Sequence, residues 1–64
     1  MQVKLIEDTL SQFEQGLITL TEFVEAMKLA NIIVGYIELV NGMIAFHCYD
    51  EYDKHIVFNT IYRP

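Results

Sequence analysis

The sequence has few of the features that stabilise small proteins covalently. Its 64 residues contain one cysteine, Cys48, so a disulfide within the chain is excluded. A single unpaired cysteine also fits a reducing compartment better than a secreted one. A chain this short buries only about 60% of the surface that its unfolded form exposes, which makes its core marginal. We therefore expect a single domain over residues 1–64, of a size that usually needs a metal or a partner subunit.

Positive charge is scarce as well. Lys and Arg total four against nine Asp and Glu, which gives a formal net charge of −5. Nucleic-acid binders rely on basic side chains to neutralise phosphates, so we expect no direct nucleic-acid binding. No apolar run approaches the roughly 20 residues of a membrane helix. Glu7 and Asp8 stand where a signal peptide would continue its apolar stretch, so we expect no membrane contact and a cytoplasmic location.

The first half of the chain is rich in helical periodicity. Val3, Ile6, Leu10 and Phe13 recur at steps of three and four residues, as on one face of an amphipathic helix. Gly16 follows, and glycine readily adopts the left-handed backbone that ends a helix. The pattern therefore predicts a first helix that stops just before Gly16.

A second helix is predicted directly after this glycine. The segment Thr19-Leu-Thr-Glu22 has the spacing of a capping box, in which the Thr19 hydroxyl and the Glu22 carboxylate each accept the other residue's backbone N–H. The apolar stripe behind it consists of Leu20, Phe23, Val24 and Met27. The first half is thus predicted to form a helical hairpin.

The second half is rich in β-branched and aromatic residues. Residues 32–40 and 43–49 flank Asn41-Gly42, the pair that favours a two-residue type I′ hairpin. A polar loop over 50–54 and a third strand over 55–62 follow. The sequence therefore predicts an α+β fold, with an N-terminal helical hairpin packed on a three-stranded antiparallel meander (ααβββ). It leaves open whether the third strand pairs with the second or swaps into a neighbouring chain.

The predicted hairpin fixes the register of the sheet and thus its two faces. A two-residue turn pairs Val40 with Met43 and Tyr36 with His47, and a symmetric loop pairs Tyr49 with His55. The face expected to pack on the helices carries Ile33, Ile37, Leu39, Ile44, Phe46, Cys48, Ile56 and Phe58. The opposite face carries Val34, Tyr36, Glu38, Val40, Met43, Ala45, His47, Tyr49, His55, Val57 and Asn59.

This opposite face has the composition of a contact surface. A solvated sheet face alternates to charged and hydroxyl residues, whereas this one offers aromatic rings, aliphatic chains and imidazoles. That mixture is typical of the buried part of protein interfaces. The residues that we predict to contact a partner are Tyr36, Glu38, His47, Tyr49, His55 and Val57.

Residues 47–55 also contain groups that could ligate metal or act as a nucleophile. His47 and His55 share a face, but zinc needs three or four convergent ligands, and Cys48 points to the other face. We therefore expect no metal site and no cofactor. A reactive thiolate needs an electropositive, partly exposed setting, so Cys48 is expected to be a small buried hydrophobe. With no catalytic pattern of side chains, the chain is not expected to be an enzyme.

Residues Gln15-Gly-Leu-Ile-Thr-Leu-Thr-Glu-Phe23 resemble the short helical-hairpin motif called SHOCT. The shared pattern is a helix, Gly, Ile-Thr, two residues, Glu-Phe and a second helix, and it covers residues 5–29. The resemblance implies oligomerisation or protein contact carried by Phe13, Ile18 and Phe23.

Size, acidity and the amphipathic sheet face predict a small acidic protein-binding regulator or inhibitor, of the kind that phages and mobile elements encode. It would bind another protein or form a homodimer, sheet against sheet. The alternative is a nucleic-acid-related role as a DNA mimic or a degenerate winged-helix regulator. Glu22 and Glu25 would face phosphates on the helix that reads DNA, which is the wrong charge for direct binding.

Overall fold

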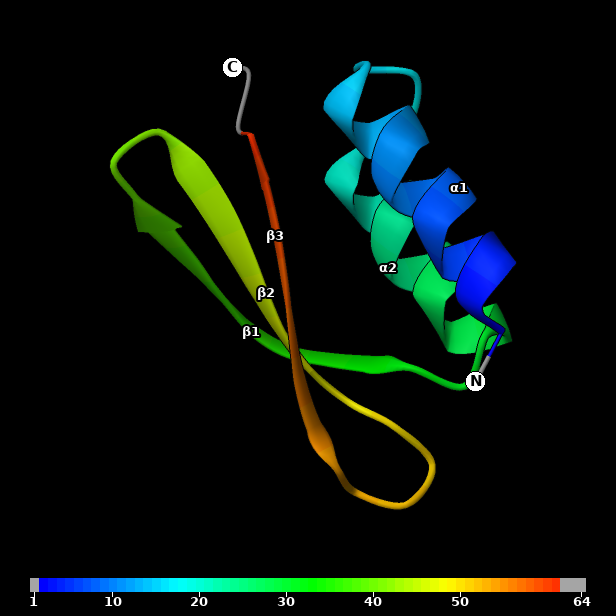
Figure 1. Ribbon diagram of the computed structural model, residues 1–64. Coiled ribbons are helices and arrows are strands. Elements are labelled where there is room, and N and C mark those ends of the chain that lie inside the picture. The colour runs from blue at the N-terminus through cyan, green and yellow to red at the C-terminus, as the bar shows by residue number, and fades with distance from the viewer. Residues whose placement is uncertain (1, 62–64) are drawn as a thin grey trace.

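The computed structural model describes residues 2–61, in which two helices cover one face of a three-stranded antiparallel sheet (Figure 1). The elements are α1 (Val3–Glu14), α2 (Leu20–Leu29), β1 (Ile33–Val40), β2 (Met43–Tyr49) and β3 (His55–Ile61). The strand order is β1-β2-β3, so the third strand pairs with the second strand of the same chain. The predicted α+β fold is confirmed. Tyr62, predicted to end the third strand, lies outside the described residues.

The helical hairpin forms through the caps that the sequence predicts. Gly16 has a φ of +73°, and the N–H groups of Gly16 and Leu17 donate to the carbonyls of Phe13 and Gln12. These two bonds form a Schellman motif, which satisfies carbonyls that the end of a helix leaves free. At the start of α2, the Thr19 hydroxyl accepts from the N–H of Glu22, and the Glu22 carboxylate accepts from the N–H of Thr19.

A second left-handed residue, which was not predicted from the sequence, turns the chain from α2 into the sheet. Asn31 has a φ of +62°, and its N–H donates to the carbonyl of Lys28 while that of Ile32 donates to Met27. This is again a Schellman motif, with asparagine in the position that glycine usually takes. Neither helix among residues 2–61 has the length and apolarity that a membrane crossing requires.

The Asn41-Gly42 turn sets the register of the sheet as predicted. Both residues have positive φ, +51° and +76°, as a type I′ turn requires. Val40 pairs with Met43, and Tyr36 pairs with His47. On the other side of β2, Tyr49 pairs with His55.

A bulge in β1 corrects the predicted faces at the start of that strand. The register shifts between Val34 and Tyr36, so Gly35 is the extra residue. Val34 therefore pairs with Cys48 and packs against the core, whereas Ile33 pairs with Tyr49 and is exposed. The predicted faces of Ile33 and Val34 were thus wrong. The extra residue of the bulge exchanges the two faces for the residues of β1 that come before it.

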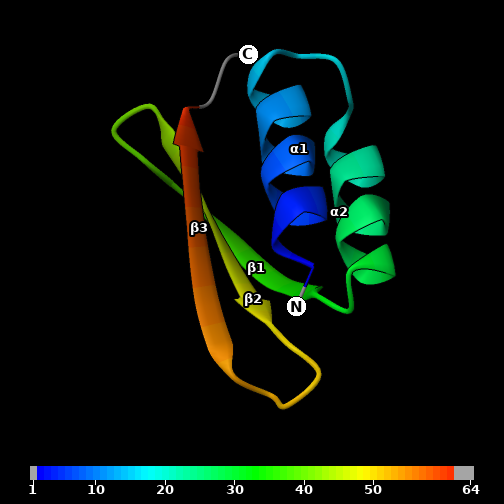
Figure 2. The same cartoon turned by 45° about the vertical axis from the view of Figure 1, so that its right-hand side comes forward.

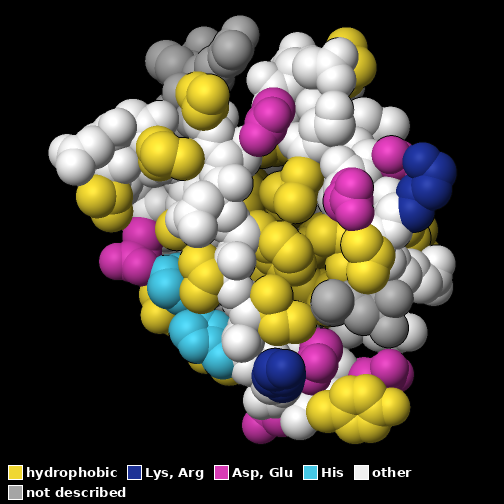
Figure 3. Space-filling view, in the orientation of Figure 1, with side chains coloured by type: hydrophobic (Ala, Val, Ile, Leu, Met, Phe, Trp, Pro, Cys, Tyr) yellow, Lys and Arg dark blue, Asp and Glu magenta, His cyan; other side chains and the backbone are white. Residues whose placement is uncertain are grey.

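The core lies between the sheet and the helices, where Figure 3 shows hydrophobic side chains filling the space. At its centre Phe23 and Phe46 stack with ring centroids 4.2 Å apart, and Phe13 packs against both rings. Ile37 and Leu39 were predicted to join this core, but they are exposed, because the end of the β1–β2 hairpin turns away from the helices (Figure 1). The buried residues are Ile6, Phe23, Met27, Ala30, Ile32, Ile44, Phe46 and Cys48.

The first helix is joined to the last described strand by a polar contact. The hydroxyl of the buried Thr60 in β3 donates to the carboxylate of Glu14 in the last turn of α1. This bond connects residues that are 46 positions apart in the sequence. It fixes β3 against α1, while α2 packs on the β1 side of the sheet.

Candidate functional site

The face of the sheet turned away from the helices, which we call the outer face, has no covering element among residues 2–61 (Figure 2). The register arranges its side chains in four cross-strand rows. These rows are Ile33–Tyr49–His55, Tyr36–His47–Val57, Glu38–Ala45–Asn59 and Val40–Met43–Ile61. All six residues predicted to contact a partner therefore lie on this one face. Among residues 2–61, the only Asp, Glu, Lys or Arg side chain of this face is Glu38.

Four rings at the centre of the outer face form what we call the ring cluster: Tyr36, His47, Tyr49 and His55. Tyr36 lies almost parallel to His47, with a centroid distance of 4.1 Å and an angle of 6°. The ring centroid of His55 lies 5.3 Å from the centroids of both His47 and Tyr49. Figure 3 shows the two histidines, in cyan, side by side at the surface. Three strands thus bring together rings that the sequence places up to 19 residues apart.

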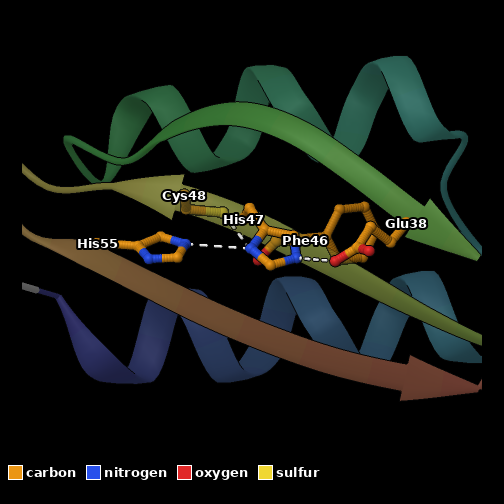
Figure 4. A network of polar contacts seen from close by, with 5 residues as sticks. All are labelled: Glu38, Phe46, His47, Cys48 and His55. Carbon is orange, nitrogen blue, oxygen red and sulfur yellow. Dashed lines mark hydrogen bonds and ion pairs between the residues drawn. The ribbon is translucent and has the colours of Figure 1, made fainter.

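A chain of hydrogen bonds crosses the sheet through His47 (Figure 4). Its Nε2 lies 2.5 Å from Oε1 of Glu38 in β1, and its Nδ1 lies 3.1 Å from Nε2 of His55 in β3. Since a carboxylate only accepts, the proton of the first bond belongs to His47 Nε2. Nδ1 of a neutral His47 then accepts from His55. If both rings were protonated, two N–H donors would face each other, so this geometry requires at least one neutral imidazole.

The ring cluster rests on Gly35, a residue outside the predicted site. A Cβ at Gly35 would lie 2.8 Å from Cε2 of Tyr49 and 3.3 Å from the carbonyl oxygen of His47. The missing side chain therefore lets the Tyr49 ring approach the backbone of β1. A glycine inside a predicted strand is the signal that could have revealed this close approach.

The carboxylate of Asp50 stabilises the loop between β2 and β3 through hydrogen bonds to the backbone. Oδ1 of Asp50 accepts from the N–H groups of Tyr52 and Lys54, each at 2.9 Å. Asp53 adopts a φ of +63°, and its N–H donates to the carbonyl of Asp50. The Asp50 carboxylate therefore shapes the loop that delivers His55 to the ring cluster.

A recess continues the outer face toward this loop. It lies between the end of α2 and the β2–β3 loop, and His55 and Val57 belong to both the recess and the outer face. Tyr52 also lines it and is 82% exposed. The recess adds an exposed aromatic side chain to the surface that a partner could contact.

Cys48 lies on the opposite side of β2 from the ring cluster. It is fully buried and its thiol contacts the carbonyl oxygen of Phe46. Burial raises the pKa of the Cys48 thiol to about 11, because the thiolate would lose its hydration. The thiol is therefore protonated at neutral pH and unsuited to nucleophilic attack.

This buried thiol should make stability depend on pH in the alkaline range. The folded chain keeps the Cys48 proton up to about pH 11, whereas the unfolded chain releases it near the ordinary thiol pKa of 9.0. The free energy of unfolding should therefore be highest below pH 9 and fall as the pH rises toward 11. Urea unfolding from pH 7 to 11 of the original chain and of a Cys48→Ala variant measures this. Equal pH profiles for the two proteins would contradict the assignment.

Comparison with protein-family models, curated proteins and solved structures finds no match to this chain. The resemblance to the SHOCT motif therefore stays a prediction.

Proposed function

We propose that this chain acts by binding another protein through its outer face, as a small acidic regulator or inhibitor. The observation that carries the proposal is the apolar and aromatic exposure of that face. Six of its large side chains are more than two-fifths exposed: Ile33, Tyr36, Val40, Met43, Val57 and Ile61. Isolated exposed apolar residues are ordinary, but several gathered on one sheet face are typical of an interaction site.

The distribution of charge supports the same face. Glu38 is the single carboxylate of the outer face, and it is already bonded to His47. The other acids lie in the β2–β3 loop and on the helices, where Asp8 and Glu25 pair with Lys4 and Lys28. A protein interface is depleted of charge at its centre and polar at its rim, which matches this arrangement.

Self-association is the second candidate, and the position of β1 favours it. β1 is an edge strand, with β2 on one side and no strand on the other among residues 2–61. Ile37 and Leu39 are exposed along it, and the part of β1 that follows the Gly35 bulge contains no Lys or Pro of the kind that protects edges. A second copy could pair with this edge, and sedimentation equilibrium of the pure chain would detect the dimer.

A double substitution tests the outer face directly. Tyr36→Ala with Val57→Ala removes two exposed side chains and spares the contact between Tyr49 and Gly35. The partner is first identified by affinity capture from the cells that encode the chain, and its binding to purified variants is then measured calorimetrically. We expect a loss of at least about 2 kcal/mol, or roughly 30-fold in Kd, because aromatic residues dominate binding energy.

The matched control removes two exposed acids from the helices, Glu7→Ala with Glu25→Ala. This variant should bind the partner as the original chain does, and both variants should keep its circular dichroism spectrum. Binding lost in the helix variant and kept in the outer-face variant would place the interface on the helices and overturn the proposal.

A further inference from the structure

The sequence predicts no metal site, because a closed zinc site needs three or four protein ligands. We propose instead that His47 and His55 form an open, two-ligand binding site for a divalent transition-metal ion such as Zn²⁺, Ni²⁺ or Cu²⁺. The observation is that two imidazole nitrogens from neighbouring strands point at each other, His47 Nδ1 and His55 Nε2, at 3.1 Å. Imidazole nitrogen is a preferred ligand of these ions. The site lies within the outer face, but its test does not depend on the proposed protein binding.

The separation of the two nitrogens suits a shared ion. Two imidazole nitrogens bound to one tetrahedral zinc at 2.0–2.1 Å lie about 3.4 Å apart. The observed separation of 3.1 Å therefore needs to open by only a few tenths of an ångström. His55 is exposed, so its ring can tilt to direct its lone pair at the ion, which would replace the proton that the two rings now share.

Glu38 prepares His47 for this role. Its carboxylate accepts from Nε2 of His47 and thereby keeps the proton on that nitrogen, so Nδ1 carries the lone pair that now accepts from His55. A carboxylate that holds the far nitrogen is the usual companion of a metal-bound histidine, because it orients the ring and strengthens the ligand. Its negative charge also offsets part of the charge of the ion. Glu38 is thus a positioning residue and not a ligand.

The surroundings fit a weak, open site. No group of three or more His, Cys, Asp or Glu ligands occurs in the part of the chain that the structure describes, so water must fill the other positions. Lys54, next to His55 in sequence, is the single cation among residues 32–61. With two nitrogen ligands and open positions, Cu²⁺ should bind most tightly and Ni²⁺ more weakly.

Calorimetric titration of the full chain with ZnCl₂ and NiCl₂ tests the site, because its two histidines are the only imidazoles in the sequence. We expect one ion per chain, and loss of this binding in His47→Gln and in His55→Gln. Absence of saturable binding, or binding retained in both variants, overturns the proposal. His55→Gln decides the question alone if His47→Gln fails to fold, since the His55 side chain is exposed.

Two further measurements test the role of Glu38 and distinguish the two histidines from other possible metal ligands in the chain. Glu38→Gln should weaken binding by about 10- to 100-fold, whereas Glu25→Gln, the same change of charge on α2, should leave it unaltered. Co²⁺ bound to the chain should show no thiolate charge-transfer absorption, because Cys48 faces the core. Such absorption, or equal loss in the two glutamate variants, would contradict the assigned ligands.

Discussion

Replacing Phe46 with alanine is expected to cost about 3–5 kcal/mol of the free energy of unfolding. Phe46 is fully buried, and its ring stacks on Phe23 and meets the edge of Phe13. The substitution removes the shared partner of two rings and leaves a cavity where the sheet meets both helices. A chain this small has a total stability of about 0.05–0.15 kcal/mol per residue, so most of it would be lost.

The control lies on the same hairpin. Leu39→Ala also shortens an apolar side chain, but Leu39 is 64% exposed and should cost less than about 1 kcal/mol. Urea unfolding followed by circular dichroism measures both variants. Similar unfolding midpoints for the two would show that the three phenylalanines are not the centre of the core.

Replacing Gly35 with alanine is expected to displace the Tyr49 ring and to cost about 1–3 kcal/mol. The new Cβ would lie 2.8 Å from Cε2 of Tyr49, which is closer than carbon atoms approach each other. Tyr49 must then move away from Gly35, which changes its stacking on His55. The ring resonances of His55 in an NMR spectrum should therefore shift together with the loss of stability.

Gly42→Ala is the comparison for this change. Gly42 has a φ of +76° and open space around it, so an alanine there strains the turn without touching the ring cluster. Gly42→Ala should lower the free energy of unfolding but leave the His55 resonances unshifted. Unchanged His55 resonances in Gly35→Ala would show that the Tyr49 ring does not depend on the bulge.

The elements and most of the register could be predicted from the sequence because local chemistry determines them. The Thr19–Glu22 capping box and the Asn41-Gly42 turn each involve residues at most three positions apart, and a two-residue turn fixes every pair until the register is interrupted. The six predicted contact residues consequently share a face. Their role in binding stays a prediction.

The remaining features depend on contacts across the fold. A glycine inside a strand is compatible with a bulge but does not require one, and the bulge at Gly35 reverses the faces of Ile33 and Val34. The alignment of Glu38 with His47 and His55 depends on side-chain directions that alternation alone does not supply. The exposure of Leu39 depends on how far the helices reach over the sheet.

The bond between Glu14 and Thr60 has a consequence for how the protein is made. A ribosome synthesises α1 first, yet the side chain that meets Glu14 is incorporated 46 residues later. Until β3 has emerged, the apolar stripe of α1 can pack only on α2 and on an incomplete sheet. The helical hairpin, with its local caps, can form early, whereas the core closes only when the last described strand arrives.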